Sequence, residues 1–211
     1  MNKQTWIYNR LHMDIKQFLD IASSDHSHLC PRQILGVRFG LRGMLVHGFD
    51  LSLRPKHLLV IAETDGCFVD GVIAVTKCTV GHRTLRIEDY GKIAATFINT
   101  KTNQAVRIAP TLDVRDKASR CVPEEKRHYF AQLQAYQSMP DEELMTVQEV
   151  ELNFNIHDIV SHAGKRVNCE KCGEEVINER EVLVEGKIYC KSCAEGGYYQ
   201  NTKTKVDQHI V

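Results

Sequence analysis

Four cysteines near the C-terminus have the spacing of a metal site. They form two Cys-x2-Cys pairs separated by seventeen residues, and the members are Cys169, Cys172, Cys190 and Cys193. Each pair places two thiolates on one side of a tight turn, and two pairs complete the tetrahedral shell that zinc prefers, with Zn–S distances of ~2.3 Å. The separation is typical of four-cysteine zinc modules. Because the protein fills all four positions, the spacing predicts a structural zinc ion rather than a catalytic one.

The same four thiols could instead form two redox-active pairs, an iron centre or buried free thiols. The surrounding segment carries few apolar residues, however, and a unit of ~30 residues with so small a core needs a staple in order to fold. A hairpin is predicted between the two pairs, because Glu185-Gly186 forms a good turn between two short apolar runs. We therefore expect a zinc finger over residues 165–200.

A second group of ligand-type residues lies near the N-terminus. His26, His28 and Cys30 fall within five residues, and Cys30 precedes Pro31, a residue type favoured at the first position of a helix. Backbone N–H groups at a helix start stabilise negative charge, so Cys30 should favour the thiolate, as should Cys67 at the predicted start of another helix. Taken singly, each thiol could equally be a small buried apolar residue, and each histidine a surface residue.

The elements that must position these residues follow from the hydrophobic pattern. Apolar residues at helical spacing predict helices, and a nearly uninterrupted apolar run before Cys67 predicts a buried strand. Thr64 or Asp65 should cap the helix that carries Cys67. The predicted helices are 5–22, about 30–47, 67 to just before Cys78, and 123–139; the predicted strands are 58–63, 84–88, 92–100, 105–109 and 147–153. The strands at 84–88 and 92–100 should pair through a turn at 89–91, as part of a meander.

Four motifs occur in a fixed order along the chain: His26–Pro31, Glu63–Asp70, Cys78–Gly81 and Asp89–Lys92. Together they resemble the family of the E subunit of formylmethanofuran dehydrogenase over about residues 12 to 155. The resemblance implies an α+β domain with a mixed sheet, similar to the catalytic domain of glyceraldehyde-3-phosphate dehydrogenase and usually dimeric. A C-terminal zinc finger is a known addition in this family. The resemblance also implies that one pocket is lined by His28, Cys30, Cys67 and Cys78.

The family name implies one-carbon metabolism in anaerobes, where a molybdenum or tungsten pterin enzyme interconverts carbon dioxide and a formylated carrier. The sequence shows neither the closely spaced cysteine runs that ligate several iron–sulfur clusters nor an obvious pterin-binding signature. By itself, the chain is therefore not expected to carry out that reaction.

The N-terminal residues would form a soft site of nitrogen and sulfur ligands. One imidazole and two or three thiolates suit zinc, iron or copper(I), and three protein ligands leave a fourth position open to water or substrate. His28, Cys30 and Cys67 are thus candidates for a second metal site and, with Cys78 and Asp70, for catalysis. Asp70 lies three residues after Cys67 on the same helical face, where it could orient a ligand or act as a base. It could equally be a helix-surface carboxylate.

Tyr90 and Lys92 flank the predicted turn at 89–91 and are candidate cofactor-binding residues, because they could hold an anionic group. Lys92 could equally be a solvated turn residue. Cys121 matches no motif.

Composition restricts the class of protein. The 27 basic and 27 acidic side chains give a formal charge of zero, without the basic excess that dominates nucleic-acid affinity. No apolar run approaches the ~20 residues that cross a bilayer, and the N-terminus lacks a signal-peptide pattern. We therefore expect a cytoplasmic protein that does not bind membranes and is not a general polyanion binder, with a main domain at 1–160 and the finger at 165–200; nucleic-acid contact stays open only for the finger.

Three functions fit these features. The leading hypothesis is a metal-binding protein of the formylmethanofuran dehydrogenase E-subunit family whose N-terminal Cys/His site serves redox or one-carbon chemistry. The first alternative is a non-enzymatic accessory protein that handles zinc or a molybdenum or tungsten cofactor for a metalloenzyme partner. The second is a regulator that acts through its zinc finger. Whether the chain is an enzyme stays open, and a homodimer is expected from the resemblance.

Overall fold

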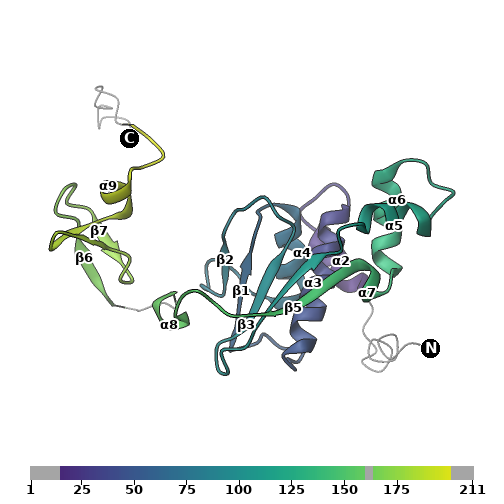
Figure 1. Cartoon of the computed structure of the whole chain (residues 1–211), viewed down its shortest axis with the longest axis horizontal. Helices are drawn as coiled ribbons and strands as arrows, with labels where there is room; N and C mark the ends of the chain where they lie inside the picture. Colours follow the sequence, from purple (N-terminus) through teal and green to yellow (C-terminus); the bar gives the residue numbers. More distant parts are fainter. Residues whose placement is uncertain (1–14, 160–163, 201–211) are drawn as a thin grey trace. The chain divides into compact units, whose positions relative to one another are not determined.

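The computed structural model describes residues 15–159 and 164–200. Of His157 it describes the backbone but not the side chain. These residues form two compact units that divide between Asp158 and Ile159. The N-terminal unit is a mixed five-stranded sheet with helices, and the C-terminal unit consists of two hairpins and a short helix (Figure 1). The predicted fold class, α+β with a mixed sheet and a small four-cysteine module, is confirmed.

The sheet of the N-terminal unit has the order β2-β1-β3-β4-β5. Strand β1 runs parallel to β2 and antiparallel to β3, with Val60 paired to Leu85 on one side and to Phe97 on the other. The remaining pairs are antiparallel. The strand bounds are β1 Leu58–Ala62, β2 Leu85–Ile87, β3 Ala95–Asn99, β4 Ala105–Pro110 and β5 Met145–Val150.

The predicted hairpin through residues 89–91 is wrong, because β2 and β3 lie on opposite sides of β1. Helix α4 (Cys67–Thr76) follows β1 and returns the chain to the edge of the sheet at which β1 begins. Strand β2 therefore runs parallel to β1. The segment after β2 then passes the end of β1, where the backbone N–H groups of Tyr90 and Lys92 both donate to the carbonyl of Glu63 at 3.0 Å. The local turn pattern at 89–91 could not reveal that β1 lies between β2 and β3 in the sheet.

Helices α2 (Ile15–Ser23), α3 (Pro31–Val46) and α4 cover one face of the sheet (Figure 1). The predicted start and end of α3 are confirmed, whereas residues 5–14 of the first predicted helix lie outside the described residues. Apolar side chains of these helices and of the sheet form one core, whose fully buried members include Ile34, Val37, Phe39, Phe68, Val72 and Phe97. Within the described part of the chain, no helix combines the length and apolarity needed to cross a membrane.

Glycines bring α3 and α4 into backbone contact. A Cβ added to Gly36 would lie 2.1 Å from the carbonyl oxygen of Phe68, and one added to Gly71 would lie 2.2 Å from the carbonyl oxygen of Gln33. One turn later, Gly40 meets Val75. Contacts therefore advance in the same direction along both helices, so α3 and α4 are parallel and begin at the same end.

A helical segment at 114–144 packs beside α3 and holds α5 (Val114–Cys121), α6 (His128–Ser138) and α7 (Asp141–Leu144). The helix predicted from residue 123 starts five residues later, and α5 was not predicted. The buried Arg38 of α3 donates to the carbonyls of Tyr136 and Met139 at 2.9 and 2.7 Å and pairs with Asp141 at 2.6 Å. This clamp fixes α6 against α3.

The C-terminal unit has very little apolar core. Strands β6 (Arg166–Asn168) and β7 (Glu175–Ile177) form one hairpin, and β8 (Val182–Val184) and β9 (Lys187–Tyr189) form the other, which confirms the predicted Glu185-Gly186 turn. Helix α9 spans Lys191–Glu195, and α8 (Ile156–Ile159) lies at the division between the units. In the described part of the C-terminal unit, the buried hydrophobic residues are Cys169 and Val176.

The close contact between α3 and α4 predicts that one methyl group added at Gly36 lowers the stability of the fold. Gly36→Ala should lower the free energy of unfolding by about 2 kcal/mol or more, because the new Cβ would collide with backbone that cannot yield without separating the helices. Alanine is the better helix former by about 1 kcal/mol, so helix propensity would act in the opposite direction. Urea denaturation followed by circular dichroism measures the change.

Gly81→Ala is the matched control, since an added Cβ there meets nothing within 4 Å, and its effect should stay within about 0.5 kcal/mol. Equal stability of the two variants would contradict the close contact.

Candidate functional site

The four C-terminal cysteines converge on one point. Their ligand atoms all lie within 4.8 Å of one another, and the sulfurs of Cys172 and Cys190 are 3.9 Å apart. The first pair sits on a turn in which the N–H of Gly173, at φ 78°, donates to the carbonyl of Cys169. The second pair begins α9, with Cys190 at the N-cap. Two structured turns therefore present four sulfurs to a common centre, as a tetrahedral zinc ion requires.

Backbone N–H groups prepare this cluster for negative charge. Burial opposes ionisation of Cys169, but the N–H groups of Cys172, Cys190 and Lys171 donate to its sulfur and lower the pKa of the thiol to about 6. The hydrogen bond from Cys190, together with burial, raises the pKa of Cys193 to about 12. Hydrogen bonding from Ser192 also lowers the pKa of Cys190, so an entering zinc ion must displace protons chiefly from Cys172 and Cys193, whose pKa values are raised.

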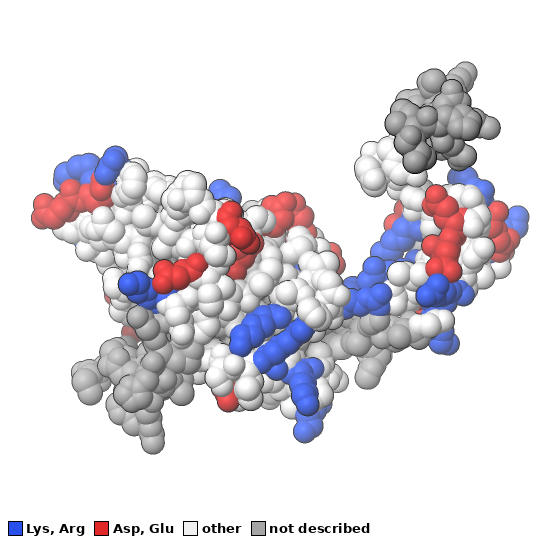
Figure 2. Space-filling view, turned by 180° about the vertical axis from the view of Figure 1, so that it is seen from behind, with Lys and Arg blue, Asp and Glu red and all other residues white. Residues whose placement is uncertain are grey.

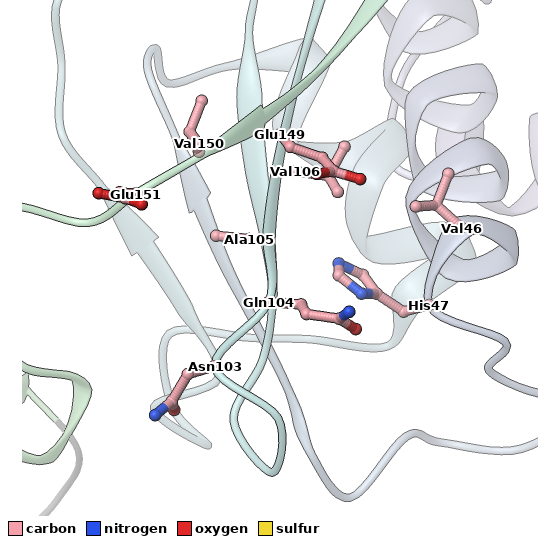
Figure 3. Close-up of a pocket in the computed structure, with 9 residues that line it drawn as sticks. All are labelled: Val46, His47, Asn103, Gln104, Ala105, Val106, Glu149, Val150 and Glu151. Atoms are coloured by element: carbon pink, nitrogen blue, oxygen red, sulfur yellow. The ribbon is translucent and has the colours of Figure 1, made fainter.

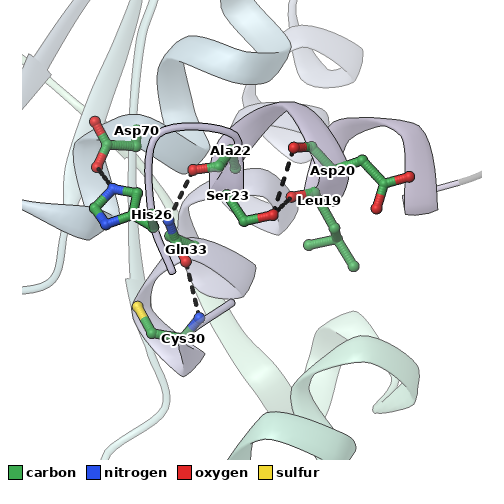
Figure 4. Close-up of polar contacts among 8 residues, drawn as sticks. All are labelled: Leu19, Asp20, Ala22, Ser23, His26, Cys30, Gln33 and Asp70. Carbon is green, nitrogen blue, oxygen red and sulfur yellow. Dashed lines mark hydrogen bonds and ion pairs between the residues drawn. The ribbon is translucent and has the colours of Figure 1, made fainter. Parts of the chain in front are cut away.

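Cys30 occupies the N-cap of α3, as predicted. Its backbone N–H donates to Gln33 Oε1 at 2.8 Å, and Gln33 Nε2 donates to the carbonyl of Ala22 at 2.7 Å. These two hydrogen bonds of the fully buried Gln33 side chain join the end of α2 to the start of α3, and so hold together both ends of the loop that carries the histidines (Figure 4). The sulfur of Cys30 is partly exposed at this helix start.

Cys67 is the first residue of α4. Gly66 occupies the N-cap with φ 73°, so neither Thr64 nor Asp65 caps the helix as predicted. The turn out of β1 needs a left-handed residue at that point, a conformation that glycine adopts without strain. Because α3 and α4 are parallel and in backbone contact, their starts adjoin, and Cys30 interacts electrostatically with the Cys67 thiol.

His26 and Asp70 complete the group around Cys67. His26 Nε2 donates to Asp70 Oδ2 at 2.9 Å, and the ligand atoms of His26, Cys67 and Asp70 lie within 4.8 Å of one another (Figure 4). The histidine that joins this group is therefore His26. His28 instead is exposed and hydrogen-bonded to Ser27 through Nδ1 at 2.8 Å.

The charge state of Cys67 differs from the sequence-based expectation. Burial raises the pKa of the Cys67 thiol, and interactions with the Cys30 side chain and with the negative charge of Asp70 raise it further. These effects outweigh the backbone N–H at the helix start, so the metal-free thiol holds its proton at neutral pH. A bound cation would reverse the balance, because a ligating thiol is deprotonated.

The other predicted residues lie elsewhere. Cys78 follows the far end of α4, about 16 Å along the helix axis from Cys67, and its buried thiol lies 3.8 Å from the carbonyl of Leu58. Tyr90 is 66% exposed and has the Lys92 ammonium 5.9 Å from its ring centre. Their backbones are held at Glu63, near the end of β1. The structure thus brings together Cys30, Cys67 and Asp70, but not Cys78.

Sequence reasoning did not single out Tyr129. Partial burial raises the pKa of its phenol, and electrostatic interactions with Cys30 and Cys67 add to the shift. No local pattern signals this position, since it depends on the tertiary contact between α6 and α3. The sequence did single out the two histidines His26 and His28. Their spacing alone, however, could not decide which of them lies beside Cys67 and Asp70.

The described residues also form a pocket of about 400 Å³ between the end of α3 and strands β4 and β5 (Figure 3). It is about 24 Å along α3 from Cys30, so it is separate from the thiol group. Its lining residues are Val46, His47, Asn103, Gln104, Ala105, Val106, Glu149, Val150 and Glu151.

Charged side chains of both signs lie close together on the described part of the zinc-finger unit. On the face drawn in Figure 2, its Lys and Arg side chains are interspersed with Asp and Glu. Arg166, for example, pairs with Glu175, and Lys165 with Glu179. Such pairing leaves little net positive charge for phosphate binding.

Several known proteins resemble parts of this chain. Residues 163–199 match the prokaryotic dksA/traR C4-type zinc finger, which agrees with the four-sulfur geometry. A probable S-adenosyl-L-methionine-binding protein of Archaeoglobus fulgidus is 34% identical over 90 residues, which cover 41% of this chain and 25% of that protein. The chain thus spans about a quarter of the length of this relative.

A crystal structure of a tungsten formylmethanofuran dehydrogenase FmdE-like protein from Syntrophus aciditrophicus has the same fold. The TM-score is 0.55 at 19% identity, over 90% of this chain and 97% of the other. Residues 26–146 match the family described as FmdE, molybdenum formylmethanofuran dehydrogenase operon, and they make up more than half of the chain. The resemblance predicted from the four motifs is therefore confirmed, and the protein belongs to the FmdE family.

Proposed function

We propose that the N-terminal unit binds a thiophilic metal ion through His26, Cys67 and Asp70 and uses it in one-carbon or redox chemistry. The observation that carries this proposal is the convergence of the three ligand atoms within 4.8 Å at the adjoining starts of α3 and α4. Nitrogen, sulfur and oxygen ligands together suit zinc and iron.

The arrangement favours an open site. Cys30 lies outside the group of three, so three protein ligands leave the fourth position of a tetrahedral ion to water or substrate. The side chains of His26 and Asp70 are 35% and 42% exposed, which gives a small molecule access to that position. A metal ion there would polarise a bound carbonyl or lower the pKa of a bound water.

The same exposure favours a second candidate function, the handling of a metal ion or metal cofactor for a metalloenzyme partner. An ion held by exposed ligands exchanges readily with solvent or with another protein. Competition with a chelator separates the two functions: a resident catalytic metal should leave slowly, and a transferred one rapidly.

His26→Ala and Cys67→Ser should each abolish cobalt(II) binding to the N-terminal site, because each removes one of three ligands. Cobalt added anaerobically to the zinc-loaded full-length chain should reach one equivalent beyond the finger, with a sulfur-to-cobalt charge-transfer band that is absent in both variants. Absorption titration and elemental analysis measure these results.

His28→Ala provides the matched control for His26→Ala, since His28 lies in the same loop but outside the ligand group. It should leave cobalt binding unchanged. Loss of binding in His28→Ala together with normal binding in His26→Ala would refute this ligand set.

Removal of the C-terminal zinc should unfold the finger and leave the N-terminal unit intact. Zinc binding supplies on the order of 10 kcal/mol to small domains of this kind, whereas the N-terminal unit has its own core. After Cys172→Ser, hydrogen exchange measured by mass spectrometry should show rapid exchange at 164–200 and retained protection at 31–46.

Cys121→Ser is the control, because Cys121 is exposed and lies outside both ligand groups. Its zinc content and exchange pattern should match those of the unmodified chain. A finger that stays protected in zinc-free Cys172→Ser would show that the metal is dispensable for folding.

A further inference from the structure

A groove lies at the end of the N-terminal unit that is away from the thiols. It has a volume of about 600 Å³ and is formed by α2, by the ends of α3 and α4, and by the loop that follows α3. Leu45 of α3 lies fifteen residues after Cys30, which corresponds to about 22 Å along the helix axis. The groove is therefore separate from the proposed metal site, and it shares no lining residue with the pocket of Figure 3.

The floor of this groove is apolar and its rim is polar. The apolar lining residues are Phe18, Ile21, Leu45, Phe49 and Leu51. Ile21 is 56% exposed and Phe49 is only partly buried, so part of this apolar surface is accessible to solvent. On the rim, the backbone N–H and the hydroxyl of Ser52 both donate to Asp50, and the Lys77 ammonium donates to the Ser52 carbonyl at 3.0 Å. An exposed apolar surface inside a polar rim is typical of a binding surface.

The course of α2 brings the beginning of the described chain to this groove. Gln33 joins the end of α2 to the start of α3, whereas Phe18, near the start of α2, lines the groove together with Leu45 at the end of α3. Helix α2 therefore runs antiparallel to α3. Its first residue, Ile15, precedes Phe18 by three positions, or about 4.5 Å along the helix axis. Residues 1–14 are thus attached to the chain next to the groove.

Residues 1–14 lie outside the described part of the chain, but their composition suits an apolar groove. They include Trp6, Ile7 and Leu11, and Trp6 is the single tryptophan of the protein. Trp6 lies nine positions before Ile15, and nine residues span up to about 30 Å when extended, so the indole is within reach of the groove. Covalent attachment also holds the segment at an effective concentration on the order of millimolar, an advantage over any partner that is free in solution.

We propose that this groove is the binding surface for the chain's own N-terminal segment, residues 1–14, with the indole of Trp6 on the apolar floor. A tryptophan side chain buries ~150–250 Å² of surface in such a contact. The hydrophobic effect favours the transfer of this surface from water onto Ile21 and Phe49. Neither the metal ligands nor the zinc finger takes part, so the inference stands apart from the proposed function.

Fluorescence of the single tryptophan tests this proposal in the full-length chain. In the unmodified chain, Trp6 should emit at a shorter wavelength than free tryptophan and should be poorly quenched by acrylamide, because the groove shields the indole from water. Ile21→Glu places a charge on the apolar floor. It should shift the emission to that of free tryptophan and raise the quenching constant several-fold. Ile21 is more than half exposed, so the fold should be retained, which circular dichroism checks.

Leu112→Glu is the matched control, because it introduces the same carboxylate at a fully exposed apolar residue outside the groove. Its emission and quenching should equal those of the unmodified chain. An emission of the unmodified chain that already equals that of free tryptophan, or one that does not change in Ile21→Glu, would overturn the inference. Shielding that disappears on dilution would also overturn it, since the groove would then hold the segment of a second copy.

Discussion

The backbone contact between α3 and α4 is the constraint on which the N-terminal site depends. Gly36 and Gly71 allow the two helices to touch without intervening side chains, and their parallel course brings both starts to one end. Parallel helices place like dipole ends side by side, which is electrostatically unfavourable. Burial of Phe68, Val72 and Val37 in the shared core offsets this cost. The remaining positive potential favours the Asp70 carboxylate and opposes the effects that raise the pKa of the Cys67 thiol, without outweighing them.

The two sulfur-rich sites differ because the units that carry them differ in core size. The finger buries very little apolar surface, so its four sulfurs must all bind the metal for the unit to fold. The N-terminal unit is stabilised by a continuous core and needs no metal for that purpose. The metal site proposed there can therefore keep a protonated thiol in the metal-free state and exposed ligand-type side chains, features that suit ligand exchange more than stability.

Local interactions made part of this structure predictable from the sequence. The start of α3 after Cys30, the Glu185-Gly186 hairpin and the four-cysteine cluster each depend on residues close together in the chain. The pairing of β2 with β1 was missed because it follows from the crossover through α4, not from the turn at 89–91. The cap of α4 was missed for a related reason, since the turn from β1 requires the left-handed backbone of Gly66. Tertiary packing also decided which residues meet at the site, as the positions of Cys78 and His26 show.

The choice between two histidines illustrates how the loop before α3 acquires its function. Gln33 fixes both ends of this loop, by its bonds to Ala22 and Cys30, so the middle has few ways to fold. His26 then meets Asp70, which lies one helical turn beyond Cys67 and on the same face of α4. A metal ion bound to these three residues would tie the loop to α4 at a third point. Metal binding should therefore order the loop, and the loop in turn determines how far the coordination position stays open to a ligand.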